Sequence, residues 1–196
     1  MAQPTNFGFG EEATLLKESA RKFFADNLPV DQLHQLVAGD PDPNRSPQCL
    51  WPQDLWRQMV DLGWTMLAVP ESAGGLGMPV VAVAGLVEEL GRAAFPCPLL
   101  PTLNATYALA ASDNAEEALA DIAQGQSATL AITNQHGDWN VSTSEVVCEN
   151  GKLNGTAWFV QDAAKVDKLL VGANSAAGLS LYWVDAAAAG VDIVAD

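Results

Sequence analysis

The side chains that most often act as nucleophiles or metal ligands are few and widely spaced in this chain of 196 residues. No Cys-x-x-Cys pair and no metal-ligand spacing of histidines occurs, so neither a disulfide framework nor a metal site is predicted. His136 stands near Asp138, but no Ser or Cys nucleophile with elbow spacing accompanies them, so a catalytic dyad is not predicted. The three cysteines and two histidines are Cys49, Cys97, Cys148, His34 and His136.

Two adjacent carboxylates, Glu88 and Glu89, interrupt an otherwise apolar segment with helical spacing. A carboxylate buried on such a helix can tune a binding pocket and have a raised pKa, which makes both residues candidate substrate-binding groups. The alternative is structural: one glutamate faces solvent and the other pairs with a nearby cation such as Arg92. The sequence leaves both interpretations open.

A glycine-rich segment, Gly74-Gly75-Leu76-Gly77, follows Val69-Pro70-Glu71. Its glycines allow a positive φ or a close backbone approach. A phosphate cradle is the functional alternative, but no parallel strand precedes the glycines and no Lys-Ser, Lys-Thr or dinucleotide fingerprint follows them. The pattern therefore favours a loop that connects two helices.

Apolar residues at steps of three and four predict that the first part of the chain is helical. A proline at the start of one segment and a glycine after the end of another mark helix boundaries. Helices are predicted at residues 11–27, 31–38, 53–62, 79–94, 103–111 and 113–124.

Near residue 126 the pattern changes to short β-rich segments separated by Gly and Asn. Asn150-Gly151 and Asn154-Gly155 are typical of tight hairpins, because both residue types tolerate a positive φ. We therefore expect a helical domain over residues 1–125 and a partial β-domain over residues 126–196. Strands are predicted at 129–133, 145–148, 156–160, 168–171, 179–184 and 191–194.

The composition limits the classes of partner. Nine Lys and Arg against 24 Asp and Glu give a formal charge of −15, which repels nucleic-acid phosphates and anionic membranes. No apolar run reaches the roughly 18 residues of a membrane helix, and the N-terminus lacks the pattern of a signal peptide. We expect a cytoplasmic protein that binds neither nucleic acid nor a membrane.

The order of these motifs resembles that of the acyl-CoA dehydrogenases, flavoproteins that desaturate an acyl-CoA between Cα and Cβ. The resemblance runs through the whole chain, from the helix end at Leu62-Gly63 and the glycine-rich loop to the Glu-Glu-Leu step. It continues in the strand that ends at Thr133. The similar segments are Leu62-Gly63, Val69-Pro70-Glu71, Gly74-Gly75-Leu76-Gly77, Val87-Glu88-Glu89-Leu90-Gly91, Ala128-Thr129-Leu130-Ala131-Ile132-Thr133 and Gly151-Lys152-Leu153-Asn154-Gly155-Thr156-Ala157-Trp158-Phe159.

The resemblance implies an α+β fold, with an N-terminal all-helical domain followed by an antiparallel, barrel-like and incomplete β-domain. It also implies a C-terminal helical bundle, which is absent from these 196 residues. In the family this bundle usually carries the glutamate that removes the α-proton. No catalytic residue is therefore assigned in this chain.

The cofactor that the resemblance implies is FAD. Where the family usually has Thr-Glu-Pro followed by Gly-Ser-Asp, this chain has Thr133-Asn134-Gln135-His136-Gly137-Asp138, without the serine expected at the pyrophosphate. The family's Trp-Ile-Thr is here Trp158-Phe159-Val160, so a methyl replaces the hydroxyl expected near flavin N5. A buried heteroatom left without its donor costs about 1–3 kcal/mol. The candidate FAD-binding residues are Ile132, Thr133, Trp158, Phe159 and Val160.

Two functions follow from the resemblance. The first is α,β-desaturation of an acyl-CoA thioester, in a homo- or hetero-oligomer that passes electrons to an electron-transfer acceptor. The alternative is a non-catalytic or flavin-sharing subunit of a heteromeric acyl-CoA dehydrogenase, such as those that act on steroid CoA thioesters. A third interpretation, an acidic helical interaction module, explains the charge but not the ordered motifs.

Overall fold

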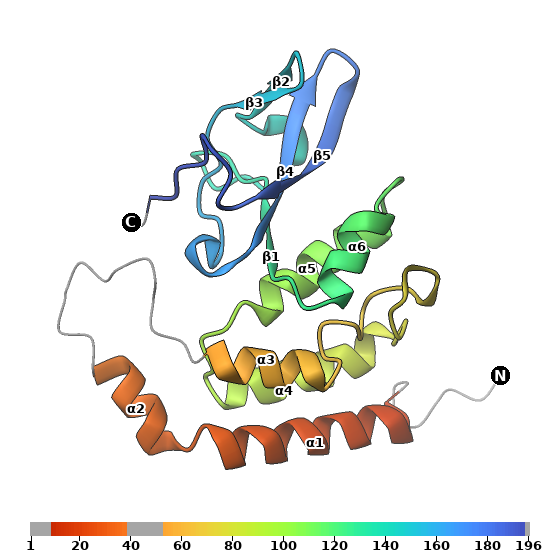
Figure 1. Cartoon of the computed structure of the whole chain (residues 1–196), viewed down its shortest axis with the longest axis vertical. Helices are drawn as coiled ribbons and strands as arrows, with labels where there is room; N and C mark the ends of the chain where they lie inside the picture. The colour runs from red at the N-terminus through yellow and green to blue at the C-terminus, as the bar shows by residue number, and fades with distance from the viewer. Residues whose placement is uncertain (1–8, 39–52, 195–196) are drawn as a thin grey trace.

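The computed structural model describes residues 9–38 and 53–194, in which a helical part is followed by a five-stranded sheet. Figure 1 shows the sheet at one end of the molecule and α1 at the other, with α5 and α6 next to the sheet. The helices are α1 (Glu11–Asn27), α2 (Val30–Ala38), α3 (Gln53–Asp61), α4 (Val80–Arg92), α5 (Leu99–Ala110) and α6 (Glu116–Ala123).

The core of the helical part forms where α1, α3 and α4 bring their apolar faces together. Helix α1 buries Ala13, Ala20 and Phe24, which recur at steps of seven and four residues and so lie on one face. The Phe24 ring lies 5.6 Å from the ring of Trp64, a separation typical of aromatic pairs. Met59 of α3 and Leu86 of α4 are fully buried in the same cluster. The apolar faces that the sequence predicts for α1, α3 and α4 therefore pack into one shared core.

The structure confirms the predicted helices and moves some of their ends. Helix α1 has the predicted bounds, whereas α5 begins at Leu99, four residues before the predicted start. Pro101 lies in the first turn of α5, where the backbone N–H that proline lacks has no intrahelical partner to lose. Pro101 is therefore compatible with a helix that begins two residues before it.

The glycine-rich segment is a helix-connecting loop, as predicted, and it is tightly packed. Gly74 has a φ of +83°. A Cβ on Gly75 would lie 2.1 Å from the carbonyl oxygen of Val69, and Val69 is fully buried. Gly75 is required here because of this close backbone approach and not because of a positive φ.

Substitution of Gly75 by Ala is expected to lower the free energy of unfolding by about 1–3 kcal/mol, because the buried Val69 backbone must move. Chemical denaturation monitored by circular dichroism measures the difference. The matched control is Gly91→Ala near the end of α4, where an added Cβ meets nothing within 4 Å. Equal stability of the two variants would contradict the packing of this loop.

The sheet is built around its longest strands, β4 (Lys168–Ser175) and β5 (Gly178–Asp185), which form an antiparallel pair. Strand β1 (Ala128–Ala131) pairs with β4 in parallel, Leu130 opposite Leu170. Strands β2 (Val147–Glu149) and β3 (Lys152–Asn154) form a hairpin, and β2 meets β4 in parallel at Asn174. The hairpin turns at Asn150-Gly151, where both residues have positive φ, as predicted.

The α+β class and the open, incomplete sheet are confirmed, but the sheet is mixed rather than antiparallel throughout. Residues 132–167 separate β1 from β4, which is enough chain to return to the same end and pair in parallel. The predicted strands at 156–160 and 191–194 are wrong, because neither segment enters the ladder. Phe159 has a φ of +52°, which is incompatible with an extended strand.

The two faces of the sheet have different surroundings. Leu170 and Ala128 pack against α5 and α6 in one apolar cluster. The opposite face carries a second cluster that includes Val146, Leu169 and Val171. Because strand side chains alternate, Leu169 and Leu170 lie on opposite faces of β4. The Trp158-Phe159-Val160 segment, which the sequence associates with FAD, lies against this second face, where Val160 packs on the apolar cluster.

Polar contacts join the helical part to the sheet. Thr102 of α5 accepts a hydrogen bond from the Ala128 N–H at 3.0 Å. The Ser127 N–H and hydroxyl both donate to the Asp167 carboxylate at 2.8 Å. The predicted domain boundary, between residues 125 and 126, falls in the link between α6 and β1. The start of β1 is therefore held firmly in relation to the helices.

Candidate functional site

The structure brings together the two segments that the sequence associates with FAD. Ile132 and Thr133 follow directly after β1, and both are buried. The Trp158 backbone N–H donates to the Thr133 carbonyl at 2.8 Å. This hydrogen bond joins residues 25 positions apart and places the Trp158-Phe159-Val160 segment beside the end of β1.

Trp158 and Phe159 form an exposed aromatic surface at this junction. The two residues are 38% and 64% exposed, and their ring centroids lie 6.5 Å apart at an interplanar angle of 44°. The positive φ of Phe159 is uncommon for a bulky residue and costs of order 1–3 kcal/mol, and such conformations cluster at functional sites. Two exposed rings held by such a backbone suit the binding of a flat aromatic ligand.

An apolar cavity of about 570 Å³ lies against this segment, on the face of the sheet away from α5 and α6. Trp158, Phe159 and the half-buried Val160 contribute to one wall, and the sheet contributes Leu169 and Val171. The side chain of Val160 offers methyl groups where a threonine would offer a hydroxyl donor. The remaining lining residues are Ala131, Val146, Leu153, Gly155, Thr156, Ala157, Ala163, Val184, Gly190, Val191, Asp192, Ile193 and Val194.

The loop after Thr133 has its own internal hydrogen bonds. The Asn134 side-chain oxygen accepts from the N–H groups of His136, at 3.0 Å, and Asp138, at 3.1 Å. The Asp138 carboxylate accepts in turn from the Asn140 N–H and the Thr143 hydroxyl. These backbone donors are therefore already used, and the Asp138 carboxylate repels a phosphate. The site fits the flat ring of a flavin, whereas this loop does not fit its pyrophosphate.

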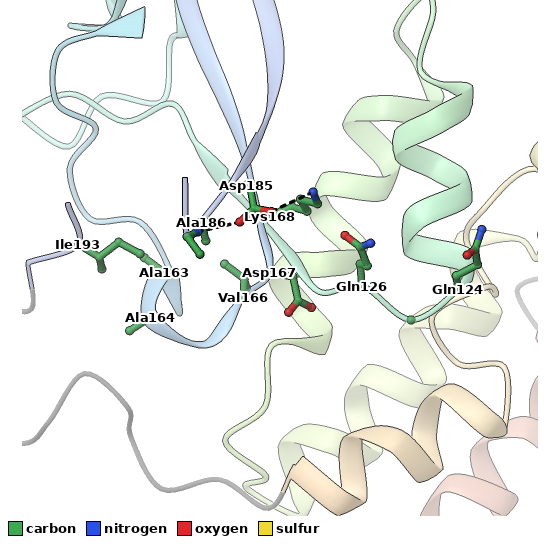
Figure 2. A pocket seen from close by; sticks show the side chains of 12 residues that line it. Gln124, Gln126, Ala163, Ala164, Val166, Asp167, Lys168, Asp185, Ala186 and Ile193 are labelled. Atoms are coloured by element: carbon green, nitrogen blue, oxygen red, sulfur yellow. Dashed lines mark hydrogen bonds and ion pairs between the residues drawn. The ribbon is translucent and has the colours of Figure 1, made fainter. Parts of the chain in front are cut away.

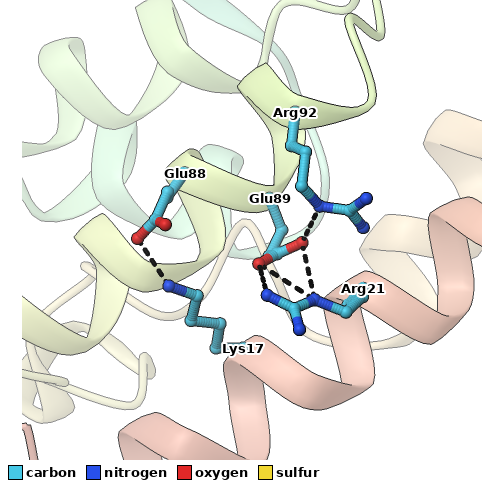
Figure 3. Close-up of polar contacts among 5 residues, drawn as sticks. All are labelled: Lys17, Arg21, Glu88, Glu89 and Arg92. Atoms are coloured by element: carbon cyan, nitrogen blue, oxygen red, sulfur yellow. Dashed lines mark hydrogen bonds and ion pairs between the residues drawn. The ribbon is translucent and has the colours of Figure 1, made fainter.

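The candidate substrate residues Glu88 and Glu89 lie elsewhere, between α1 and α4 (Figure 3). The fully buried Glu89 carboxylate pairs with Arg21 at 2.8 Å and with Arg92 at 2.6 Å. Hydrogen bonding by Arg21, reinforced by Arg92 and opposed by burial, lowers the pKa of Glu89 to about 2. Glu88 is exposed and pairs with Lys17 at 2.6 Å. These contacts bear out the structural interpretation with Arg92, and neither glutamate lines the apolar cavity.

A second cavity, of about 620 Å³, lies where the helical part meets the sheet (Figure 2). Its wall carries the Lys168–Asp185 ion pair at 3.5 Å and the Gln126 side chain, whose Oε1 atom is buried without a hydrogen-bond partner. The sequence did not predict this cavity, because its lining residues come from four separate segments without a shared motif. None of the candidate FAD residues lines it.

The described ranges hold no metal cluster, and they bury the Cys97 thiol. No cluster of three His, Cys, Asp or Glu side chains that could hold a metal ion occurs within residues 9–38 and 53–194. Burial raises the pKa of the Cys97 thiol to about 12, which keeps it protonated and unreactive. Cys49 lies outside the described residues. Within the same ranges, no helix is both long and apolar enough to cross a membrane.

The helical part followed by the mixed sheet is the fold of an acyl-CoA dehydrogenase type of protein. The model of the acyl-CoA dehydrogenase N-terminal domain matches residues 10–126. The chain belongs to the acyl-CoA dehydrogenase family, an oxidoreductase flavoprotein family, which confirms the resemblance seen in the sequence.

Individual relatives and solved structures agree with this family. Acyl-CoA dehydrogenase IpdE2 of Mycobacterium tuberculosis is 32% identical over 162 residues, covering 80% of this chain and 48% of that protein. A variant of the Tcur3481-Tcur3483 steroid ACAD superposes with a TM-score of 0.74 at 31% identity, over 93% of this chain and 50% of that chain. The ChsE4-ChsE5 complex from Mycobacterium tuberculosis has the same fold, with a TM-score of 0.76 at 23% identity, over 95% of this chain and 50% of that chain.

Further solved structures with this fold are complexes with FAD or FADH2. The chain spans about half the length of the relatives that it matches.

Proposed function

We propose that this chain is part of an FAD-dependent acyl-CoA dehydrogenase and forms one wall of its flavin site. The observation that carries the proposal is the 2.8 Å hydrogen bond from Trp158 to Thr133, since it unites both candidate FAD segments. Family membership, together with the FAD complexes among structures of this fold, supports the choice of cofactor.

Each candidate residue has a definite part in this proposal. Trp158 and Phe159 supply the aromatic surface that faces the flavin ring, and the Thr133 carbonyl keeps Trp158 in place. Ile132 and Val160 supply apolar contacts that exclude water. When bound, FAD supplies the redox chemistry by accepting a hydride from Cβ of the acyl-CoA. The base for the α-proton is not assigned to this chain, and we propose that a further segment or a second subunit provides it.

A second candidate function is a flavin-sharing subunit of a heteromeric acyl-CoA dehydrogenase. The internally bonded, acidic loop at residues 134–143 favours it, because this loop leaves the pyrophosphate to be bound by other residues. The 31% identity to a steroid ACAD and the shared fold with a two-component complex support a steroid CoA thioester as substrate and an unlike chain as partner. In both functions an electron-transfer acceptor reoxidises the flavin.

Substitution of Val160 by Thr is expected to raise FAD retention roughly three- to tenfold, because the new hydroxyl restores a donor at the aromatic wall. The measurement is flavin content per mole of purified protein, taken from absorbance. Val147→Thr on β2 is the matched control, since Val147 lies outside the apolar cavity. A folded Val160→Thr variant with the flavin content of the original chain would argue against this placement.

The reaction itself is tested by mass spectrometry of the acyl-CoA. The chain, together with a co-expressed partner of the same family, is incubated with a steroid CoA thioester, a straight-chain acyl-CoA and an artificial electron acceptor. Loss of two hydrogens from either thioester supports the dehydrogenase, and preference for the steroid thioester supports the heteromeric form. No desaturation of either compound by a flavin-loaded sample would contradict the proposed function.

A further inference from the structure

The Trp158 indole is bound by a residue to which the sequence assigns no role. The indole Nε1–H donates to the Glu145 carboxylate at 3.0 Å. Glu145 is half-buried and lies thirteen residues before Trp158, in the segment that leads into β2. A hydrogen bond to a charged acceptor is stronger than one between neutral groups, so the contact can fix the direction of the ring.

The backbone on both sides of Glu145 is fixed to β4. The Ser144 hydroxyl donates to the Gly172 carbonyl at 2.6 Å, and the Asn174 side chain donates to the Ser144 carbonyl at 3.2 Å. The Asn174 N–H donates to the Val146 carbonyl at 2.9 Å, and Val146 is buried. The Glu145 side chain therefore extends from a rigid segment, so it can hold the indole rather than follow it.

The chain that leads to Trp158 crosses Glu145 at close range. A Cβ on Gly155 would lie 2.1 Å from the Glu145 carbonyl oxygen and 2.7 Å from Val146 Cα, and the φ of Gly155 is +139°. Only glycine allows this approach at that backbone conformation. The crossing brings residues 155–158 against Glu145 and sets the indole within reach of its carboxylate.

We infer that Glu145 is a positioning residue, whose carboxylate fixes the plane of the Trp158 indole where it lines the apolar cavity. The Trp158 backbone is already held by Thr133, and the carboxylate adds a second point of attachment at the far end of the side chain. With both points in place, rotation about the side-chain torsions is restricted. The consequence for FAD rests on the proposed function. An indole that is already oriented loses less conformational entropy when the flavin ring binds against it.

The inference is tested with Glu145→Ala, which removes the acceptor, and Glu145→Gln, which keeps a side-chain oxygen acceptor without the charge. Proton exchange of the Trp158 indole with solvent is measured by nuclear magnetic resonance, and Trp158→Phe assigns the signal. We expect Glu145→Ala to accelerate this exchange roughly three- to tenfold and Glu145→Gln to restore most of the protection. The other five tryptophan indoles serve as internal controls. Unchanged exchange in Glu145→Ala would overturn the inference.

Flavin content of the same variants tests the link to the site. We expect Glu145→Ala to retain several-fold less FAD than the original chain, and Glu145→Gln to recover it. If the indole is loosened but FAD retention is unchanged, Glu145 does not position a flavin wall. If the original chain binds no FAD alone or with a partner, the proposed function fails, whereas the exchange measurement still decides whether Glu145 holds the indole.

Discussion

Replacement of Trp158 by Ala is expected to reduce FAD retention roughly tenfold or more. Stacking of an aromatic side chain on a flat ring contributes on the order of 1–3 kcal/mol, and the indole is a large part of the exposed aromatic surface at this site. The variant should fold, because Trp158 is 38% exposed and belongs to none of the three buried apolar clusters. The measurement is the ratio of flavin to protein absorbance after purification and dialysis.

The matched control for this prediction is Trp139→Ala. Trp139 is also an exposed tryptophan, at 64%, and it lines neither cavity. It should leave FAD retention unchanged. Equal loss of flavin in both variants would show that a general effect of tryptophan removal, and not a wall at Trp158, explains the result.

The second large effect is expected at Glu89. Substitution by Ala should lower the free energy of unfolding by about 2–3 kcal/mol, because it leaves two guanidinium groups without the buried carboxylate that joins them. This lies below the range typical of a broken buried pair, since Arg21 and Arg92 are each about half exposed and can turn towards solvent. Figure 3 shows both arginines directed at the one carboxylate, from α1 and from α4. Denaturant unfolding measures the loss.

Glu88→Ala is the control for Glu89→Ala. Glu88 is the adjacent glutamate and also forms an ion pair, but its side chain is 67% exposed. An exposed pair contributes under about 1 kcal/mol. A similar loss of stability in both variants would contradict the assignment of Glu89 as the buried centre of the contact between α1 and α4.

The pH dependence of stability follows from the same carboxylate. The folded structure lowers the pKa of Glu89 from 4.5 to about 2. Its contribution is therefore fully present above about pH 4.5 and is lost as the pH falls towards 2. The stability difference between the original chain and Glu89→Gln should shrink over that interval. A difference that stays constant from pH 5 to pH 2.5 would show that Glu89 is not held as a buried anion.

Local patterns in the sequence were sufficient to predict most of the helices and one of the two arginines that bind Glu89. The amphipathic spacing of α1 predicted its bounds. Helical spacing offered Arg92 as a partner for one of the two glutamates, and the structure shows that this glutamate is Glu89. Arg21 could not be predicted as the other partner, because it lies 68 residues away on another helix. Contacts between distant segments depend on packing that no local period encodes.

The aromatic surface of Trp158 and Phe159 also depends on features that the local sequence does not reveal. The resemblance to a known family pointed to Trp158 and Thr133, but the segment at 156–160 was predicted to be a strand. A positive φ at Phe159 is rare for its residue type and leaves no signal in the sequence. Glu145 was missed because a single glutamate beside a strand carries no motif, and its role depends on the crossing at Gly155.

The visible absorption spectrum of the purified chain shows whether the Trp158 segment forms a wall of an FAD site. The spectrum is recorded for the chain alone and for the chain co-expressed with a second acyl-CoA dehydrogenase-like chain, with intact mass measured on each sample. We predict flavin bands near one FAD per chain in at least one of these samples, and bands only with the partner would identify a shared site. A folded chain that is colourless alone and in every combination would contradict a flavin wall at Trp158.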